Sequence, residues 1–335
     1  MNRSAATMKR EPSYVEFAVA SNFSFLHGAS HPEELIGQAA HLGLAGLGLC
    51  DRNSVAGVVR AHLAKRENDL PLRYHPGARL VFSDGTPDIL AFPRDRPGWG
   101  RLCRLLTRGN LRARKGDCIL FLDDLLDHAE GLELIVMEAS THATAPRLQG
   151  EAAERSEAGE DGGATPAAAD MLPRPARLAL RRVLSPGGEK EAALPPFLLR
   201  LRAAAPGRVR LAACMLYRGD DGARLAARAR LARQAEMPLI AVNDVLYHHF
   251  ERRPLQDVLT CIREHLRIDT AGRRLAANAE RYLKPAAEMA RLFRAAPEAI
   301  EETLRLSEAL AFSLDELRYE YPDEMVEGFA SPQEA

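Results

Sequence analysis

The amino-acid sequence predicts an α/β barrel followed by an α-helical segment. Three observations support this fold class. Short apolar runs typical of buried strands alternate with helical stretches in the first half of the chain and recur up to Asn243. Seven or eight such runs occur, which favours a closed barrel over an open sheet. Beyond Tyr247 no strand-like run follows, and the remaining periodic stretches are helical.

The predicted strands are apolar or β-branched runs that give way to polar or turn residues. They cover Tyr14–Ala20, Gly46–Asp51, Arg79–Phe82, Ile89–Phe92, Ile119–Leu122, Leu132–Met137, Val209–Cys214 and Pro238–Asn243. Helices are predicted between them over Pro32–Leu42, Ser54–Lys65, Trp99–Thr107 and Ala223–Gln234, and after them over Leu255–His265, Ala286–Phe293 and Pro297–Phe312. Ser30 and Glu33 have the spacing of a capping box at the start of the first helix.

The predicted secondary structure divides the chain of 335 residues into a barrel domain at 14–250 and a helical part at 251–335, after a disordered N-terminus at 1–13. A stretch at about 139–175 interrupts the barrel. Its centre, Glu151–Asp170, holds six acids against the single Arg155 and almost no large apolar residue. Such a segment cannot bury enough surface to offset its ordering entropy, so we expect a mobile insertion without chemistry.

Composition excludes several function classes. The 45 Lys+Arg and 46 Asp+Glu residues nearly cancel, so the chain as a whole is not a basic nucleic-acid coat. Five scattered cysteines without a C-x-x-C pair argue against a disulfide framework or a zinc knuckle. No apolar run is long enough for a membrane span or a signal peptide, which predicts a soluble, cytoplasmic protein without membrane partners.

The ends of the predicted strands carry the polar residues that a barrel active site would use. Nucleotide-binding loops of the G-x-x-x-x-G-K-[ST] and G-x-G-x-x-G types do not occur, and neither does a G-x-S-x-G elbow. Asp51 and Asp244 each follow a strand and could face one pocket. His27, His31, His248 and His249 lie nearby but form no H-x-H or D-x-H pair at strand spacing. We therefore favour an interpretation in which Asp51 caps the next helix and Asp244 orders a loop.

Two long segments resemble a known family. Residues 14–60 read YVEFAVASNFSFLHGASHPEELIGQAAHLGLAGLGLCDRNSVAGVVR, and residues 239–285 read LIAVNDVLYHHFERRPLQDVLTCIREHLRIDTAGRRLAANAERYLKP. The first is similar to the opening of the PHP domain in bacterial C-family DNA polymerases, and the second to the end of that domain. Both resemble the error-prone, DnaE-type, ImuC-like branch. The resemblance implies a distorted seven-stranded (β/α) barrel, and it runs from about residue 14 to 335 apart from the insertion.

The resemblance also identifies where metal ligands stand in metal-binding relatives, in the motifs H-x-H, D-H, G-x-E and D-x-H. The matching positions here are Ala18, Ala20, Asp51, Arg52, Arg79, Asp244 and Leu246. Four imidazoles and one carboxylate are therefore replaced, and two guanidinium groups would repel a divalent cation. We expect a degenerate metal site, no metal and no catalytic residue in this chain, and pairing of Arg52 and Arg79 with Asp51 and Asp244 as a structural substitute.

The polymerase reaction itself is not expected from these residues. The resemblance implies DNA synthesis across damaged template during repair, with paired palm aspartates that hold two magnesium ions. We expect the chain to stop before that palm, with no cofactor of its own and magnesium needed only by the full-length enzyme. The remainder of the polymerase (palm, thumb and fingers) is then its expected partner, with DNA bound by the full-length enzyme and a structural role for this region.

One basic run could contact phosphates or DNA. It contains Arg101, Arg104, Arg108, Arg112, Arg114 and Lys115. Arg104 and Arg108 lie one helical turn apart and share a face. A solvated helix surface is the favoured interpretation, because 40 of the 45 basic residues of the chain are arginines and no aromatic residues are interleaved for base stacking.

Two alternatives stay open. The first is a metal-dependent PHP phosphoesterase or 3'-5' exonuclease built on Asp51, Asp244 and the nearby histidines, which metal analysis with a nuclease assay would detect. The second is a non-catalytic binding module that docks a sliding clamp or accessory translesion proteins through the basic run or the acidic tail. Pull-down experiments with Arg104 and Arg108 changed to Glu would separate it from an inert fragment.

Overall fold

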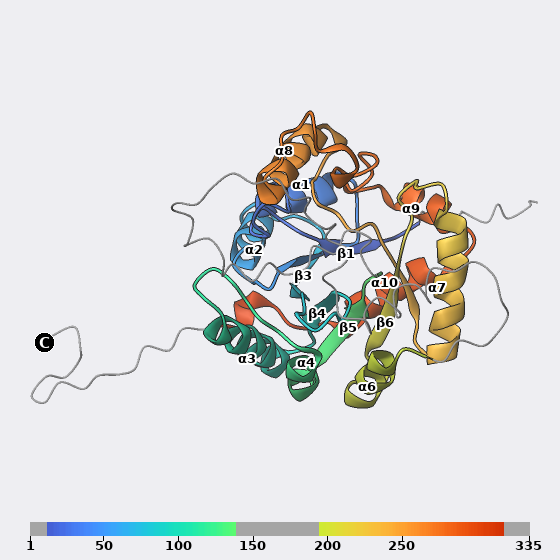
Figure 1. Ribbon diagram of the computed structural model, residues 1–335. Helices are drawn as coiled ribbons and strands as arrows, with labels where there is room; N and C mark the ends of the chain where they lie inside the picture. Colours follow the sequence, from blue (N-terminus) through green and yellow to red (C-terminus); the bar gives the residue numbers. More distant parts are fainter. Residues whose placement is uncertain (1–11, 139–193, 318–335) are drawn as a thin grey trace, which may run out of the picture.

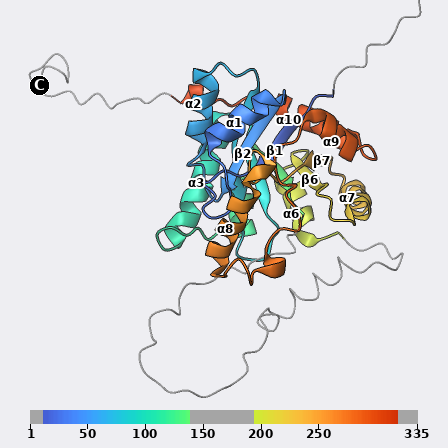
Figure 2. The ribbon, with the colours of Figure 1, turned by 90° about the horizontal axis from the view of Figure 1, so that it is seen from above.

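The computed structural model describes residues 12–138 and 194–317, which form a barrel of strands surrounded by helices (Figure 1). The strands are β1 (Val15–Val19), β2 (Gly46–Arg52), β3 (Arg73–Leu80), β4 (Ile89–Pro93), β5 (Leu132–Val136), β6 (Val209–Cys214) and β7 (Leu239–Val242). The helices are α1 (Pro32–His41), α2 (Val58–Glu67), α3 (Arg96–Arg112), α4 (Leu122–His128), α6 (Pro196–Ala204), α7 (Asp221–Ala235), α8 (Arg253–Glu264), α9 (Ala286–Leu292) and α10 (Glu298–Ala309). Seen from above, α2 and α3 lie on the opposite side from α7 and α9 (Figure 2).

The seven described strands follow one another around the barrel in chain order. Neighbours are parallel except at β4, which runs antiparallel to both β3 and β5. The barrel closes where the chain leaves β7: the Ala20 N–H donates to the Val245 carbonyl at 3.0 Å, and the Val245 N–H donates to the Ala18 carbonyl at 2.7 Å. This confirms the distorted seven-stranded α/β barrel, and the reversed β4 is its main departure from regular α/β alternation.

Apolar side chains pack on both sides of the strands. Leu47 and Leu49 of β2 pack with α1, whereas Phe17 and Phe92 pack edge to face inside the ring, with centroids 5.1 Å apart. The Phe92 ring lies against the backbone of neighbouring strands at positions occupied by glycine. A Cβ on Gly77 would stand 2.5 Å from the Phe92 ring, closer than carbon atoms can approach. The barrel interior is therefore a packed core.

Helix α10 covers the amino end of the barrel. Its Thr303 hydroxyl accepts a hydrogen bond from the Val15 N–H at 3.3 Å, and the Ser307 hydroxyl lies 2.8 Å from His75 Nε2. Below them, Arg210 pairs with Glu133 on the neighbouring strand and donates from Nε to Glu302 of α10 at 2.7 Å. All of these side chains are buried. The helix thus seals one end of the barrel with polar contacts and leaves the carboxyl ends of the strands open.

Most predicted elements are present, with differences at their ends. Residues 209–214 form β6 as predicted, and each of the other observed strands overlaps a predicted run. The strand predicted at Ile119–Leu122 is wrong: Leu120 makes one isolated bridge to Phe82, and α4 begins at Leu122. The helices α4 and α6 are absent from the prediction, because both are too short to show a clear helical periodicity.

The start of α1 differs from the predicted capping box. The residue before the helix is His31, whose N–H donates to the Glu34 carboxylate at 2.8 Å, one position later than expected. The Ser30 hydroxyl instead lies 2.8 Å from His248 Nδ1. The predicted insertion at about 139–175 falls outside the described residues, as does most of the predicted disordered N-terminus. None of the described helices has the length and apolar character of a membrane span.

Candidate functional site

The carboxyl ends of β1, β2, β3 and β7 meet at the open end of the barrel, and the predicted site residues gather there. Ala18 and Ala20 supply the backbone groups that close the ring against Val245, so no side chain with metal-binding atoms projects from these two positions. Leu246, at the last of the four imidazole positions that the resemblance marks, is buried and packs beside Ala20. The remaining positions carry charges, and these charges are paired within the fold.

The Asp51 side chain forms its hydrogen bonds with the loop that follows β1. Its carboxylate accepts hydrogen bonds from the Ser21 N–H at 2.8 Å, the Ser21 hydroxyl at 2.8 Å and the Ser24 hydroxyl at 2.7 Å. Burial raises the pKa of Asp51, and the hydrogen bonds from Ser24 and Ser21 oppose that rise. The expected helix-capping role is wrong, because α2 begins after Gly57 and every hydrogen bond found for the Asp51 side chain goes to Ser21 or Ser24 within the described residues.

Asp244 lies between two arginines. One carboxylate oxygen pairs with Arg79 of β3, and the other accepts a hydrogen bond from Arg281 Nη2 at 2.5 Å. Arg281 also donates from Nε to the Asp244 carbonyl at 2.8 Å, so Asp244 fixes the segment after α8 as well as its own turn. Burial alone would raise the pKa of Asp244, but Arg281 and Arg79 hold it at about 2. Asp244 is therefore a carboxylate at neutral pH.

The predicted pairing of arginines with aspartates is half correct. Arg79 pairs with Asp244 as expected, and although burial disfavours its charge, Asp244 and Asp88 raise its pKa above the usual range. Arg52 does not reach Asp51: its Nη1 lies 3.6 Å from Asp88 on the loop before β4. We name Arg52, Arg79, Asp88, Asp244 and Arg281 the carboxyl-end ion cluster. Sequence reasoning missed Asp88 and Arg281, because neither stands at a position that the family motifs mark.

The cluster is positively charged around His27. Arg263 of α8 lies 3.1 Å from His27 Nδ1 through its Nη1. Burial lowers the pKa of His27 to about 2, and Arg52 and Arg263 add to the shift by repelling its charged form. A divalent cation would meet the same repulsion at this position. Across residues 12–138 and 194–317, no group of three or more His, Cys, Asp or Glu side chains could hold a metal ion, so the residues present do not fit the metal that the PHP motifs imply.

The other three histidines serve the loops at this end. His31 Nδ1 lies 3.0 Å from the Asn22 amide. His248 Nδ1 lies 2.8 Å from the Ser30 hydroxyl, in the contact that replaces the predicted cap, and His249 Nδ1 lies 3.5 Å from Glu251. His31 therefore has a separate polar partner, whereas the rings of His248 and His249, with centroids 6.5 Å apart, line one hollow with Gln38, Glu251 and Arg252.

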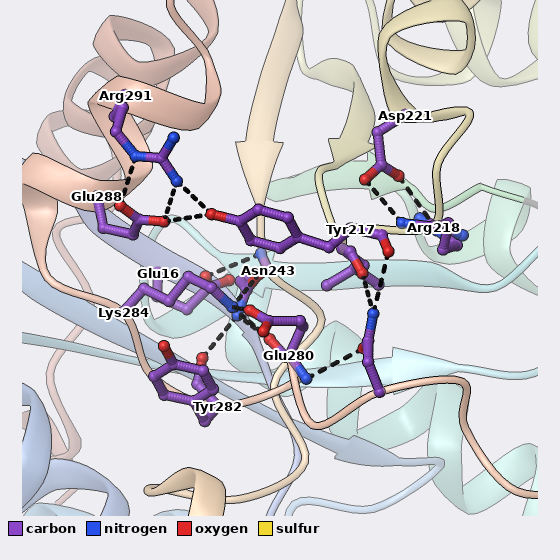
Figure 3. A network of polar contacts seen from close by, with 12 residues as sticks. Glu16, Tyr217, Arg218, Asp221, Asn243, Glu280, Tyr282, Lys284, Glu288 and Arg291 are labelled. Atoms are coloured by element: carbon purple, nitrogen blue, oxygen red, sulfur yellow. Dashed lines mark hydrogen bonds and ion pairs between the residues drawn. The ribbon is translucent and has the colours of Figure 1, made fainter.

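A second polar network holds the seam between β1 and β7 (Figure 3). The buried Glu16 carboxylate accepts hydrogen bonds from the Tyr14 hydroxyl at 2.7 Å, the Ala18 N–H at 2.9 Å and the Asn243 N–H at 2.9 Å. Burial raises its pKa to about 7 against these donors. The Lys284 ammonium lies 3.3 Å from Asn243 Oδ1 and 3.2 Å from the Glu280 carboxylate. A carboxylate thus takes the place of backbone acceptors where the two strands do not pair.

The same view shows a clasp outside the seam. The Tyr217 hydroxyl, on the loop after β6, donates to Glu288 of α9 at 2.7 Å, and Arg291 contacts both groups. The clasp and the seam network together fix residues 278–291 against the barrel. That segment carries Arg281, so these contacts also position the ion cluster.

The basic run lies on α3 and the turn after it, away from the ion cluster. Arg101 pairs with Glu130, Arg108 with Asp124 and Asp127, and Arg112 donates to both oxygens of Asp124 at 2.6 and 2.9 Å. Ion pairs therefore offset the charges of Arg101, Arg108 and Arg112 among the six predicted phosphate contacts. Arg104 and Lys115 are exposed and have no ion pair among the described residues. A phosphate or DNA contact here stays a prediction.

Comparison with known proteins agrees with this geometry. Residues 16–165 match the model of the PHP domain. An error-prone DNA polymerase from Rhodopseudomonas palustris (strain BisA53) is 48% identical over 94% of this chain and 27% of its own length. Those from a Bradyrhizobium species and Mesorhizobium japonicum are 47% and 46% identical over 93% and 96% of this chain. The chain spans about a quarter of the length of these curated relatives.

A solved amidohydrolase structure from Chromobacterium violaceum covers 70% of this chain and 88% of its own, at 15% identity and a TM-score of 0.39. That similarity is too low to add to the fold described above. The sequence relatives are far closer, and the matched PHP residues include the ends of β1, β2 and β3, where Asp51, Arg52 and Arg79 stand. Residues 16–165 of this chain are therefore similar to the PHP domain family, in a chain that is similar over nearly its whole length to error-prone DNA polymerases.

Proposed function

We propose that this chain is the PHP-domain region of an error-prone DNA-directed DNA polymerase that acts in translesion synthesis and DNA repair. One observation carries the proposal: identity of 44–48% to curated error-prone polymerases over about 94% of the chain. The role of the region in that enzyme is structural. Its former metal positions hold an ion cluster whose carboxylates are paired with arginines, which supports a scaffold better than a reaction centre.

The phosphoesterase alternative has little support from the geometry. A metal-dependent hydrolase needs carboxylates and imidazoles free to bind ions and to lower the pKa of bound water. Asp51 accepts three hydrogen bonds and Asp244 is paired with Arg79 and Arg281. The two carboxylates that this alternative requires are thus already used by the fold.

The proposal assigns nucleotidyl transfer to other parts of a full-length polymerase. Two magnesium ions, deoxynucleoside triphosphates and DNA would bind in its palm, thumb and fingers, and those parts would be the main partner of this region in the cytoplasm. Contacts with a sliding clamp or accessory translesion proteins are further predictions, for which a pull-down with Arg104→Glu and Arg108→Glu variants is the test.

A hybrid polymerase tests the function. In the R. palustris BisA53 enzyme, the segment that matches this chain is replaced by residues 1–335, and primer extension past an abasic site is measured with magnesium. We expect the hybrid to extend primers within about tenfold of its parent, because a scaffold of 48% identity keeps its contacts. A hybrid that folds but extends no primer would contradict the proposal. Metal-dependent nuclease activity of the 335-residue chain, lost in Asp244→Ala, would support the phosphoesterase instead.

A further inference from the structure

Helix α8 has its apolar side turned toward solvent. Leu255, Val258 and Ile262 are 40%, 44% and 53% exposed, and their spacing of three and four residues places them on one stripe of the helix. An amphipathic surface helix of a globular protein normally turns such a stripe to the core. We name Leu255, Val258 and Ile262 the α8 apolar face.

The inward side of α8 is correspondingly polar. Its buried residues are Gln256, Thr260 and Cys261. The Thr260 hydroxyl donates to the Gln256 carbonyl at 2.9 Å, and the Gln256 side-chain oxygen is buried with no hydrogen-bond partner among the described residues. The apolar packing of the inward side comes from Leu259, which contacts the cluster of Ala20, Ala29, Leu246 and Tyr247, and from the buried Cys261. The larger apolar stripe of the helix therefore stays outside, alongside these limited inward contacts.

Two contacts fix this orientation and extend the apolar surface. Arg253 donates from Nη2 to the Ala276 carbonyl at 2.6 Å, and Arg263 donates from Nη1 to the Leu26 carbonyl at 2.8 Å. The second contact brings the loop after β1 against α8. Phe25, next to Leu26, is 79% exposed, and Ile268 beyond the helix is 58% exposed. Large apolar side chains thus continue on both sides of Arg263.

The surroundings indicate the chemistry of the partner. Arg273 and Arg274 are exposed just after this surface and have no ion pair among the described residues. The centre of the surface is aliphatic, which suits a protein segment rather than stacked bases. A partner that fits would present apolar side chains flanked by acidic ones.

The relatives contain a large part of the polymerase that lies outside the region matched by this chain. In the relatives at 46–48% identity, this region is 23–27% of the polymerase, so about three quarters of each relative lies outside it. Exposed apolar patches on a domain mark surfaces that other domains or proteins cover. We propose that the α8 apolar face packs against the remainder of the polymerase, through an apolar segment with acidic flanks. This inference rests on the proposed function and adds to it the surface that makes the contact.

Side-chain oxidation by hydroxyl radicals tests the contact in the hybrid polymerase described above. The oxidation rates of Leu255, Val258 and Ile262 are measured in the 335-residue chain and in the hybrid, with Leu111, 84% exposed on α3, as the reference. We expect the three rates to fall about fivefold or more in the hybrid relative to Leu111. Equal rates in both proteins would overturn the proposal. The same labelling of the R. palustris polymerase gives the answer if the hybrid does not fold.

Matched variants provide a second readout. Val258→Glu with Ile262→Glu is compared with Leu111→Glu in both proteins. In the 335-residue chain, both changes should shift the midpoint of thermal unfolding by less than about 2 °C, since all three side chains are exposed. In the hybrid, only the α8 variant should lower the midpoint, by about 3 °C or more. Equal midpoints for the two hybrids would overturn the proposal.

The outcomes separate this inference from the proposed function. A hybrid that extends no primer, yet protects the α8 apolar face, would reject the polymerase function and keep the contact. A hybrid that extends primers with the face still reactive would do the reverse. If the 335-residue chain forms a dimer that the α8 variant abolishes while the hybrid leaves the face reactive, a second copy is the partner and the proposal fails.

Discussion

The two ends of the barrel both contain ion clusters, but only one is sealed. At the amino end, Arg210, Glu133 and Glu302 have side chains less than 10% exposed beneath α10. At the carboxyl end, the members of the ion cluster are 10–34% exposed, and three arginines face two aspartates. The sealed end is a structural joint. The open end carries arginines at two of the positions where the PHP resemblance predicts metal ligands, so a fold of this kind does not by itself fix the chemistry at one site.

The largest expected effect is at the sealed end. Arg210→Met leaves the buried Glu133 and Glu302 with the half-exposed Arg94 and Arg305 as their cationic partners within the described residues, and breaking a buried ion group in this way costs up to about 3–5 kcal/mol. Urea denaturation should show that loss in the free energy of unfolding. The control is Arg305→Met, because Arg305 is 59% exposed and its removal should cost less than about 1 kcal/mol. Similar losses for both variants would mean that the amino end is not the stronger joint.

Substitutions in the carboxyl-end ion cluster should lower the free energy of unfolding by a smaller amount. Asp244→Asn leaves Arg79 and Arg281 facing each other without a carboxylate, which we expect to cost about 2–3 kcal/mol at neutral pH. Asp88→Asn is the control, since Asp88 lies 3.6 and 3.8 Å from its two arginines and should cost less than about 1 kcal/mol.

The pH dependence gives an independent check on Asp244. Its pKa is lowered to about 2 from an ordinary 3.8, so its contribution to stability is complete above pH 3.8 and is lost as the pH falls toward 2. The free energy of unfolding, measured between pH 5 and the lowest pH at which the protein stays folded, should fall less steeply for Asp244→Asn than for the unchanged chain. Parallel curves would show that Asp244 does not carry this dependence.

The Glu16 network at the seam between β1 and β7 should give a pH dependence of stability with the opposite sign. Burial raises the pKa of Glu16 from 4.5 to about 7, so its protonated form favours folding below pH 4.5, and that contribution is lost as the pH rises through 7. Glu16→Gln resembles the protonated acid and should remove about 1–3 kcal/mol of this loss. Unfolding curves from pH 5 to 8 measure it, and a slope that Glu16→Gln leaves unchanged would argue for a carboxylate already ionised at pH 5.

The smallest effect is expected at Arg52. Its Nη1 only approaches Asp88, at 3.6 Å, while Arg79 and Arg263 repel its charge, so Arg52→Gln should change stability by less than about 1 kcal/mol. The same variant should raise the pKa of His27, which Arg52 helps to depress. An NMR titration of the His27 ring reports that change. A loss of several kcal/mol would instead make Arg52 a structural partner equal to Arg79.

The sequence indicates the barrel better than it indicates the contacts within it. Strands such as Leu239–Val242 are predictable because a short, continuous apolar run bounded by polar or turn residues is typical of a buried strand. The reversal of β4 is not, since Ile89–Pro93 would read alike in either direction. The prediction that Asp51 and Asp244 lie at the same end of the barrel follows from the positions where the predicted strands end. The contacts that Ser21, Asp88 and Arg281 make in the site could not be predicted, because the positions of these residues depend on strand register and on loops without periodicity.

Helix α10 also constrains the order in which the protein can fold. The hydrogen bond from Val15 to Thr303 joins residues 288 positions apart in sequence. As the chain leaves the ribosome, β1 emerges first but cannot gain its cover until the last described helix has been made. Completion of the barrel therefore depends on a contact of long sequence separation, and β1 lacks that cover until the contact forms. Its first strand depends on residues from the far end of the described chain.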